Sequence, residues 1–400
     1  MLARTDHRTP ASSRLNLNPR LNPNSRQAGF SLVEIVVALV IGMLGMIVIM
    51  QVFGVFGAQK RSTSGGNEAQ NNGAIALYGL QRDIQQSGYG IGDLRLLGCS
   101  VALRAGVVLT NLAPLTIYPA GTVNPPIPAG DANTDTLLVV YGNSNSSVLG
   151  EEIRGGGGTA YTMETPFGFA VNDRVIAHAK ARGGACIGVN ALTLDTVNGA
   201  AGASITVASG GGLITNQLFN LGPAPVVRAY AIRGGNLTVC DYMVSNCGSA
   251  ADAAPPVNPT VWVPIASNIV SLRAQYGNDT TLVGGRAARP NTVDIYSLVS
   301  TAPAGARDGS VECGWARIPA VRIVLVARSE QFEKTNVTGP GVGTAPTPTW
   351  AGSFARPAGS AITPINLSLD PNWQRFRYKV FETTIPIKNI GWMPDAPTTC

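Results

Sequence analysis

A long run of apolar residues near the N-terminus constrains this chain more than any other feature. No polar side chain occurs over residues 35–50, and after Gln51 the run continues to Ala58, which gives 24 positions in all. A helix needs roughly 20 apolar residues to cross the core of a bilayer. A cleaved secretory signal instead has an apolar region of about 7 to 15 residues that ends in small side chains. The run therefore predicts a membrane-spanning helix over residues 30–58.

Positive charge is concentrated ahead of this run. Residues 1–29 hold five arginines and one aspartate, so they carry +4 of the formal charge of +6 and leave +2 for the rest of the chain. Since positive charge stays on the cytoplasmic side, the bulk of the chain is predicted to lie outside the membrane. The near-neutral remainder shows no basic stripe, so we expect no nucleic-acid partner.

Glu34 lies at the threshold of the apolar run. A carboxylate in a membrane helix costs roughly 2.5–3.5 kcal/mol at the centre and less near the interface, so it calls for a partner. No Lys or Arg follows it within the run. Cleavage between Gly29 and Phe30 would create a free amine on Phe30, which could neutralise Glu34 of a neighbouring chain.

The sequence "GFSLVE" at residues 29–34, followed by a continuous apolar helix, resembles the class III leader of type IV pilins and type II secretion pseudopilins. The resemblance implies that a prepilin peptidase cuts after Gly29 and methylates Phe30, and that Glu34 guides docking into a growing filament. Residues 1–29 would then be the leader. It is longer than is common in the family, which leaves open a start codon further downstream.

Beyond the membrane, residues 59–88 are predicted to continue the helix in the periplasm. Leu77, Leu80 and Ile84 recur at helical spacing, and Ser87-Gly88 favours a helix end. Gly42 and Gly45 either allow close approach of a neighbouring helix or merely soften this one.

Residues 89–400 are predicted to form a β-rich periplasmic globular domain, in keeping with 47 glycines and 27 prolines. Candidate strands cover residues 136–141, 173–179, 204–208, 226–233, 236–243, 321–329 and 376–389. Residues 265–277 favour a short amphipathic helix or a passage from helix to strand. Residues 119–130, 251–260 and 339–360 are rich in proline and glycine and predict loops.

Two C-terminal blocks, residues 316–330 and 376–392, resemble the PilW family of minor type IV pilins. Residues 99–260 resemble it only weakly and form the variable part. The resemblance implies an α+β, pilin-like fold: a long N-terminal helix, transmembrane then amphipathic, packed on an antiparallel β-sheet with loop insertions.

The same resemblance implies a minor pilin that acts in pilus initiation and assembly, and thereby in twitching motility and adhesion. Its partners would be the prepilin peptidase, other minor pilins and the major pilin. It would lie in the bacterial inner membrane as a single-pass protein and then in the pilus. Two alternatives are a J-like tip pseudopilin of a type II secretion system and a pilus-tip adhesin or DNA-uptake subunit.

Six cysteines, all beyond the apolar run, predict structural disulfides in an oxidising compartment. The candidates are Cys99, Cys186, Cys240, Cys247, Cys313 and Cys400. Cys240 and Cys247 close a short loop and are the first pair expected; Cys313 with Cys400 is a second hypothesis. A metal site is not expected, because no C-x2-C pair or histidines at ligand spacing occur.

No catalytic residue or cofactor is predicted. His178 stands alone on a predicted strand, and "RGGGG" at 154–158 lacks the G-K-[ST] of a phosphate-binding loop, so it favours a flexible turn. The turn at 181–186 has the same character. Two acidic pairs, Glu151-Glu152 and Asp131/Asp135, favour solvated loop charges. The five tryptophans (Trp262, Trp315, Trp350, Trp373 and Trp392) favour core packing over a ligand platform.

Overall fold

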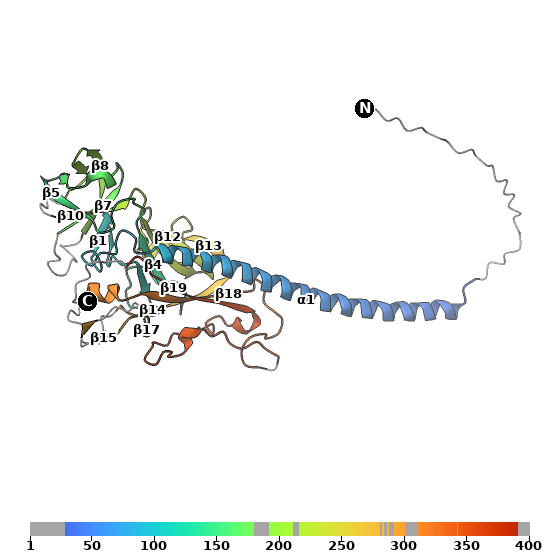
Figure 1. Ribbon diagram of the computed structural model, residues 1–400. Helices are drawn as coiled ribbons and strands as arrows, with labels where there is room; N and C mark the ends of the chain where they lie inside the picture. Colours follow the sequence, from blue (N-terminus) through green and yellow to red (C-terminus); the bar gives the residue numbers. More distant parts are fainter. Residues whose placement is uncertain are drawn as a thin grey trace, which may run out of the picture. The chain divides into compact units, whose positions relative to one another are not determined.

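The computed structural model describes residues 29–179, 192–210, 216–280, 282–283, 286–287, 292–300, 311–341 and 343–390. The chain divides into two compact units, Met1–Lys60 and Arg61–Cys400. Helix α1 (Leu32–Gln86) runs without interruption through the boundary between them. The first unit is apolar helix, and the second is largely β structure (Figure 1).

In the first unit, α1 is apolar on every side. Its segment Leu32–Gly54 has a mean hydropathy of 2.9, and none of it is buried. By length and composition this segment can cross a membrane. No proline interrupts α1, so every backbone amide beyond the first turn can bond within the helix.

In the second unit, the distal part of α1 buries one face against the β domain. Ala69, Ala76, Leu80 and Ile84 are buried at intervals of seven, four and four residues, which places them on one side of a helix. The helix ends at Gln86, as the Ser87-Gly88 signal predicts. The hydroxyl of Ser87 donates to the carbonyl of Ile84 (2.7 Å), and Gly88 adopts a φ of +85°, which suits glycine.

A five-stranded antiparallel sheet has the order β13-β12-β11-β4-β3. Its strands are β3 (Leu115–Tyr118), β4 (Thr136–Tyr141), β11 (Val226–Arg233), β12 (Asn236–Asp241) and β13 (Val263–Ser267). All six residues of β4 are buried, because its sheet is covered on both faces.

A four-stranded antiparallel sheet has the order β17-β14-β18-β19. Its strands are β14 (Ile269–Asn278), β17 (Ile295–Ser297), β18 (Ala320–Arg328) and β19 (Tyr378–Pro386). The helix or helix-to-strand passage predicted for residues 265–277 is therefore wrong. That segment holds the end of β13 and most of β14, joined at Asn268 with a φ of +58°. Burial of β14 between two layers outweighs its helical spacing of apolar residues.

The middle of the chain forms a closed β-barrel rather than the loop insertions that the sequence predicts. Successive pairings run β8-β7-β10-β5-β6-β9 and return from β9 to β8. The strands are β5 (Glu151–Gly157), β6 (Ala160–Met163), β7 (Arg174–Ala179), β8 (Leu192–Ala201), β9 (Ser204–Val207) and β10 (Asn216–Gly222). Short strands β1 (Val101–Arg104) and β2 (Val107–Leu109) extend this sheet through a parallel contact between β1 and β8.

The barrel has an apolar interior of its own and is inserted between β4 and β11, which pair with each other. The interior residues are Ile153, Tyr161, Met163, Phe169, Val175, Val197, Ile205, Val207 and Leu218. The turn predicted at 154–158 is wrong for most of its length, because residues 154–157 belong to β5. Glycine without a side chain fits a sharply curved strand, and Gly156 has a φ of +115°.

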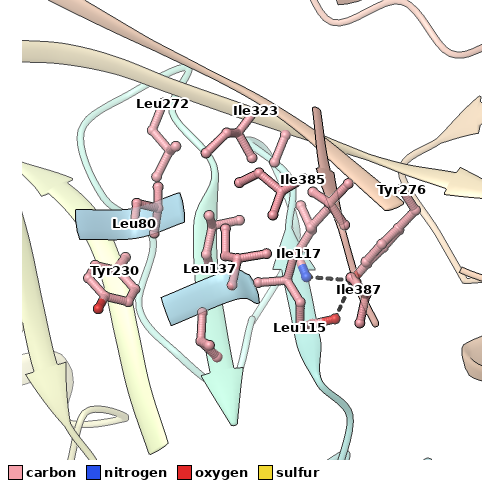
Figure 2. Packing of buried hydrophobic residues seen from close by; sticks show 14 of the residues in the cluster. Leu80, Leu115, Ile117, Leu137, Tyr230, Leu272, Tyr276, Ile323, Ile385 and Ile387 are labelled. Atoms are coloured by element: carbon pink, nitrogen blue, oxygen red, sulfur yellow. Dashed lines mark hydrogen bonds between the residues drawn. The ribbon is translucent and has the colours of Figure 1, made fainter. Parts of the chain in front are cut away.

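One core joins the distal part of α1 to both open sheets. Figure 2 shows Leu80 of α1 among Leu137 of β4, Ile323 of β18 and Ile385 of β19. The hydroxyl of Tyr276 accepts a hydrogen bond from the amide of Ile117 (2.5 Å), which links the two sheets at the edge of this core.

Seven strands predicted from the sequence are present as β4, β7, β9, β11, β12, β18 and β19, with ends that differ by at most three residues. The remaining short elements are β15 (Leu282–Val283), β16 (Arg286–Ala287), α2 (Ala250–Ala253), α3 (Val311–Ala316), η1 (Pro166–Gly168), η3 (Ala351–Ser353) and η4 (Trp373–Arg375).

Candidate functional site

The N-terminal hexapeptide lies in the open at the start of α1. Gly29 and Phe30 precede the helix, and the side chain of Phe30 is 80% exposed. Space is open around Gly29, since no heavy atom lies within 4 Å of the position a Cβ would take. An extended and accessible backbone is what a peptidase needs to bind around the bond it cuts.

Glu34 lies in the first turn of α1. Its position favours a carboxylate, because the unpaired amides of a helix N-terminus carry partial positive charge. The first helical hydrogen bond described runs from the amide of Ile35 to the carbonyl of Ser31 (3.2 Å). No cation is paired with Glu34 among the described residues of the first unit.

The apolar surface that follows Glu34 is far larger than a soluble monomer leaves uncovered. The large apolar side chains described from Leu32 to Val52, together with Phe53 and Phe56, are between 45% and 78% exposed. Contiguous apolar patches of this extent mark a surface for lipid or for another protein. Gly42 and Gly45 have open space beside them, which is compatible with close helix packing.

The disulfide expected first is confirmed. Cys240 and Cys247 are bonded with a Cα–Cα distance of 5.8 Å, and both are buried. Cys99 forms a disulfide as well, and so does Cys313. Cys186 and Cys400 lie outside the described residues, so the pairing of Cys313 with Cys400 stays a prediction.

A buried polar cluster fixes the distal part of α1 to the five-stranded sheet. Asp83 of α1 accepts hydrogen bonds from the hydroxyls of Tyr141 (3.1 Å) and Tyr230 and from the guanidinium of Arg228 (3.1 Å). Burial, and then the charge of Asp83, raises the pKa of Tyr141 to about 12 and also raises the pKa of Tyr230. The cluster holds a negative charge in a protein interior by giving it three donors.

A second buried pair joins the two open sheets. Asp135 is fully buried, lies 3.0 Å from the guanidinium of Arg273 and accepts hydrogen bonds from the amides of Ala120 (2.9 Å) and Ala274 (2.8 Å). Burial raises the pKa of Asp135, and these partners oppose that shift. The expectation of a solvated loop charge is wrong for Asp135. Asp131 accepts from the amides of Gly234 and Gly235 at a turn.

A stacked arginine anchors the C-terminal loops on the outer face of the four-stranded sheet. Arg322 lies 3.7 Å from the ring centroid of Tyr296 and 5.5 Å from that of Trp350. Its Nε donates to the side-chain oxygen of Gln275 (2.6 Å), and burial lowers its pKa. Trp350 belongs to a buried apolar cluster with Val324, Val326, Ile365 and Leu367, so this arginine closes a hydrophobic layer.

The remaining sequence candidates lie on strands or in the apolar core. His178 is buried on β7, and Glu151 and Glu152 lie on β5 rather than in a loop. Trp262, Trp315 and Trp350 are buried and Trp373 is half-buried, as core packing predicts, while Trp392 and residues 181–186 lie outside the described part of the chain. Within the part that is described, no group of three or more His, Cys, Asp or Glu side chains is placed to hold a metal ion.

Sequence reasoning missed the cluster around Asp83. A signal existed, because Asp83 falls between Leu80 and Ile84 on the apolar stripe of the helix. An ionisable residue next to the buried face of a helix predicts a buried partner, but its partners lie on strands 58 and 147 residues away.

An exposed apolar helix of this length can anchor a protein in a membrane. Residues 24–50 match the prokaryotic N-terminal methylation motif, and residues 256–389 match type IV pilus-assembly protein W. These matches confirm the resemblance to the PilW family. No curated protein and no solved structure matches this chain.

The second match covers the whole four-stranded sheet and one strand of the five-stranded sheet. Residues 256–389 contain β13 and all four strands of the sheet β17-β14-β18-β19. The barrel lies outside both matches. The weak resemblance expected for residues 99–260 covers this barrel, which has its own interior, together with β1 to β4, β11 and β12.

Proposed function

We propose that this chain is a minor pilin of a type IV pilus, processed by a prepilin peptidase and active in the initiation and assembly of the filament. The observation that carries this proposal is the occurrence of both family matches in one chain, with "GFSLVE" placed at the start of an uncovered apolar helix. The role is assembly rather than catalysis.

Processing acts at the bond between Gly29 and Phe30. Hydrolysis by water leaves a carboxylate on Gly29 and an amine on Phe30; a methyl donor bound by the processing enzyme then gives up its methyl group to that nitrogen, which loses a proton. The exposed position of both residues supports access by the peptidase.

Assembly then uses Glu34 and the apolar helix. The amine of Phe30 on one subunit neutralises Glu34 of its neighbour, which removes two uncompensated charges from an apolar surrounding. The exposed apolar face of α1 leaves lipid for contact with the helices of other minor pilins and the major pilin. The arginine-rich leader stays in the cytoplasm, and the β domain lies in the periplasm before assembly.

The β domain follows a pilin-like plan in this proposal. The distal part of α1 packs on antiparallel strands through Leu80 and Ile84, and the Asp83 cluster fixes its position. The match of residues 256–389 to a type IV pilus protein favours this system over the type II secretion alternative.

Replacing Gly29 tests the processing step. Gly29→Val should block removal of the leader, because a bulky side chain next to the cleaved bond obstructs the peptidase. Mass spectrometry of the purified protein should then find the intact leader and an unmethylated Phe30. Gly54→Ala is the control, since it also adds a side chain in open space and should be processed normally. Normal processing of Gly29→Val would show that the motif is not the cleavage site.

A further inference from the structure

One end of the β domain lies beside the start of the distal part of α1. The position that a Cβ would take at Gly65 is 3.2 Å from the Cβ of Ser329. The amide of Ser329 donates to the carbonyl of Arg377 (2.9 Å), just before β19 begins. At the other end of the helix, the side chain of Asn389 donates to the carbonyl of Gln86 (3.1 Å). Strand β19 therefore runs alongside α1 in the same direction, and its first residues lie at the Gly65 end.

A short tether joins this end of the domain to the apolar span. The segment that can cross a membrane ends at Gly54, and residues 55–65 connect it to the contact at Ser329. Even a fully extended chain of that length reaches no further than about 40 Å. A surface on such a tether meets its partner at an effective concentration of the order of millimolar, so that weak attraction is enough for binding. The opposite end of the domain is joined to the span by the whole of residues 55–86.

Two C-terminal segments, residues 328–334 and 370–379, form the surface at this end, which we call the Phe332 surface. They are joined through their backbones, since the amide of Glu333 donates to the carbonyl of Arg375 (2.7 Å). An ion pair between the two segments reinforces this contact. The side chains of the Phe332 surface are therefore carried on a fixed frame.

Phe332 is an exposed aromatic residue that is held in place from beneath. Its ring meets that of Phe376 edge to face, with centroids 6.1 Å apart, and yet its side chain is 60% exposed. Phe376 is itself buried, and the guanidinium of Arg328 lies 4.6 Å from its ring centroid. Because Phe332 already has a support, it loses little conformational freedom when its outer face is covered.

The Phe332 surface also carries an excess of positive charge. It holds five basic and three acidic side chains, a net charge of +2: Arg328, Lys334, Arg375, Arg377 and Lys379 against Glu330, Glu333 and Asp370. Residues 30–400 carry +2 in total, so the rest of the chain beyond residue 29 is neutral as a whole. Lys334 and Arg375 are exposed and form no ion pair with any residue that the structure describes.

We propose that the Phe332 surface binds the headgroup region of the membrane that α1 crosses, through the phosphates of anionic phospholipids. An aromatic ring among basic side chains is the composition that favours a membrane interface, where the ring enters the headgroup layer and the bases meet phosphate. Lipid is the partner that the tether itself supplies, whereas a protein partner would have to be recruited. The contact holds the β domain on the bilayer before assembly. It rests on the membrane anchor of the proposed function and not on its role in the pilus.

A benzophenone amino acid at position 332 of the full-length protein tests the proposal. The protein is reconstituted into nanodiscs of phosphatidylglycerol and phosphatidylcholine in equal parts and then illuminated. Mass spectrometry of the peptides should find a phospholipid adduct at residue 332. The matched control is the same amino acid at Phe167, which is 97% exposed on the barrel and should give no such adduct. The barrel joins the open sheets beside Tyr89, beyond the far end of α1.

Charge reversal tests the electrostatic part of the proposal. Lys334→Glu combined with Arg375→Glu should lower the yield of the adduct about tenfold, because each base contributes to the attraction of an anionic surface. Lys388→Glu is the control, since it makes the same change at an exposed lysine beyond the other end of β19 and should leave the yield unchanged. The unaltered surface provides a second measurement should the double variant be unstable. High salt, or nanodiscs of phosphatidylcholine alone, should lower its yield as well.

Four results would overturn the proposal: no lipid adduct at residue 332, an equal adduct at residue 167, crosslinks to protein alone, or a yield that neither charge nor lipid composition changes. Protein that fails to insert into the nanodiscs would contradict the anchor itself and this inference with it. None of these results depends on cleavage after Gly29, so they are separable from the processing test.

Discussion

At the scale of the residue, Glu34 and Asp83 show two ways of keeping a carboxylate on one apolar helix. Asp83 is satisfied within the chain by Tyr141, Tyr230 and Arg228. Glu34 has no such partner among the described residues of its own unit and lies in an exposed first turn. A charge without an internal partner is costly in an apolar environment, so the partner is expected from outside the chain.

Glu34→Ala should strongly reduce incorporation of the protein into pili while leaving removal of the leader intact. The reason is that the substitution removes the charge that pairs with Phe30 of a neighbour but leaves Gly29 unchanged. Immunoblots of sheared pili and of membranes measure the two effects separately. Glu34→Asp keeps the charge and should retain part of the incorporation. Undiminished incorporation of Glu34→Ala would refute the docking role.

At the scale of the element, α1 depends on the sheet for the geometry of its distal part. Its apolar contacts are small or aliphatic side chains, and Gly73 leaves room for the ring of Phe381, which a Cβ would obstruct. Such contacts allow a helix to slide or rotate, whereas the Asp83 cluster requires one register. Directional hydrogen bonds therefore fix the orientation that apolar burial only favours.

The Asp83 cluster predicts an alkaline limit to stability. The pKa of Tyr141 rises to about 12 on folding, from about 10 in an unfolded chain, so the folded state favours the neutral phenol. Its contribution is complete below about pH 10 and is lost as pH rises towards 12. The thermal midpoint of the full-length protein in detergent should fall over this range.

Tyr141→Phe is the control for that experiment, because it keeps the ring and removes the ionisable group. The variant should have a lower midpoint at neutral pH, since Asp83 loses one donor at a cost of about 1–3 kcal/mol. It should also show a shallower fall above about pH 10. A pH profile parallel to that of the wild type would show that Tyr141 is not the titrating group.

At the scale of the molecule, the inserted barrel and the open sheets share apolar contacts. A single buried cluster contains Ile176, Leu194 and Phe219 of the barrel together with Leu138 and Val140 of β4. Three hydrogen bonds reinforce the junction, from Tyr89 to Ser144 (2.8 Å), from Arg95 to Leu149 (3.2 Å) and from Asn143 to Leu221 (2.7 Å). The second unit is therefore expected to unfold as one cooperative body.

Tryptophan fluorescence can test this coupling, because all five tryptophans lie outside residues 151–222. Met163→Ala opens a cavity inside the barrel and should lower the fluorescence-monitored midpoint of the full-length protein, as Leu325→Ala should from the core of the open sheets. If Met163→Ala leaves that midpoint unchanged and circular dichroism shows an earlier transition, the barrel unfolds independently.

Local patterns in the sequence determined those parts of this protein whose structure depends on residues close together in the sequence. The hexapeptide at 29–34, the apolar helix and its end at Gln86, and strands such as β4 and β18 follow from residue type and spacing over a few turns or residues. The match of residues 256–389 agrees with the resemblance drawn from two short blocks within or overlapping it.

Only the tertiary structure decided the rest, because each remaining feature joins residues that are distant in sequence. Closure of the barrel depends on β5 meeting β10 and on β6 meeting β9, and no local pattern specifies these pairings. Burial of Asp135 requires Arg273 on another strand, 138 residues away.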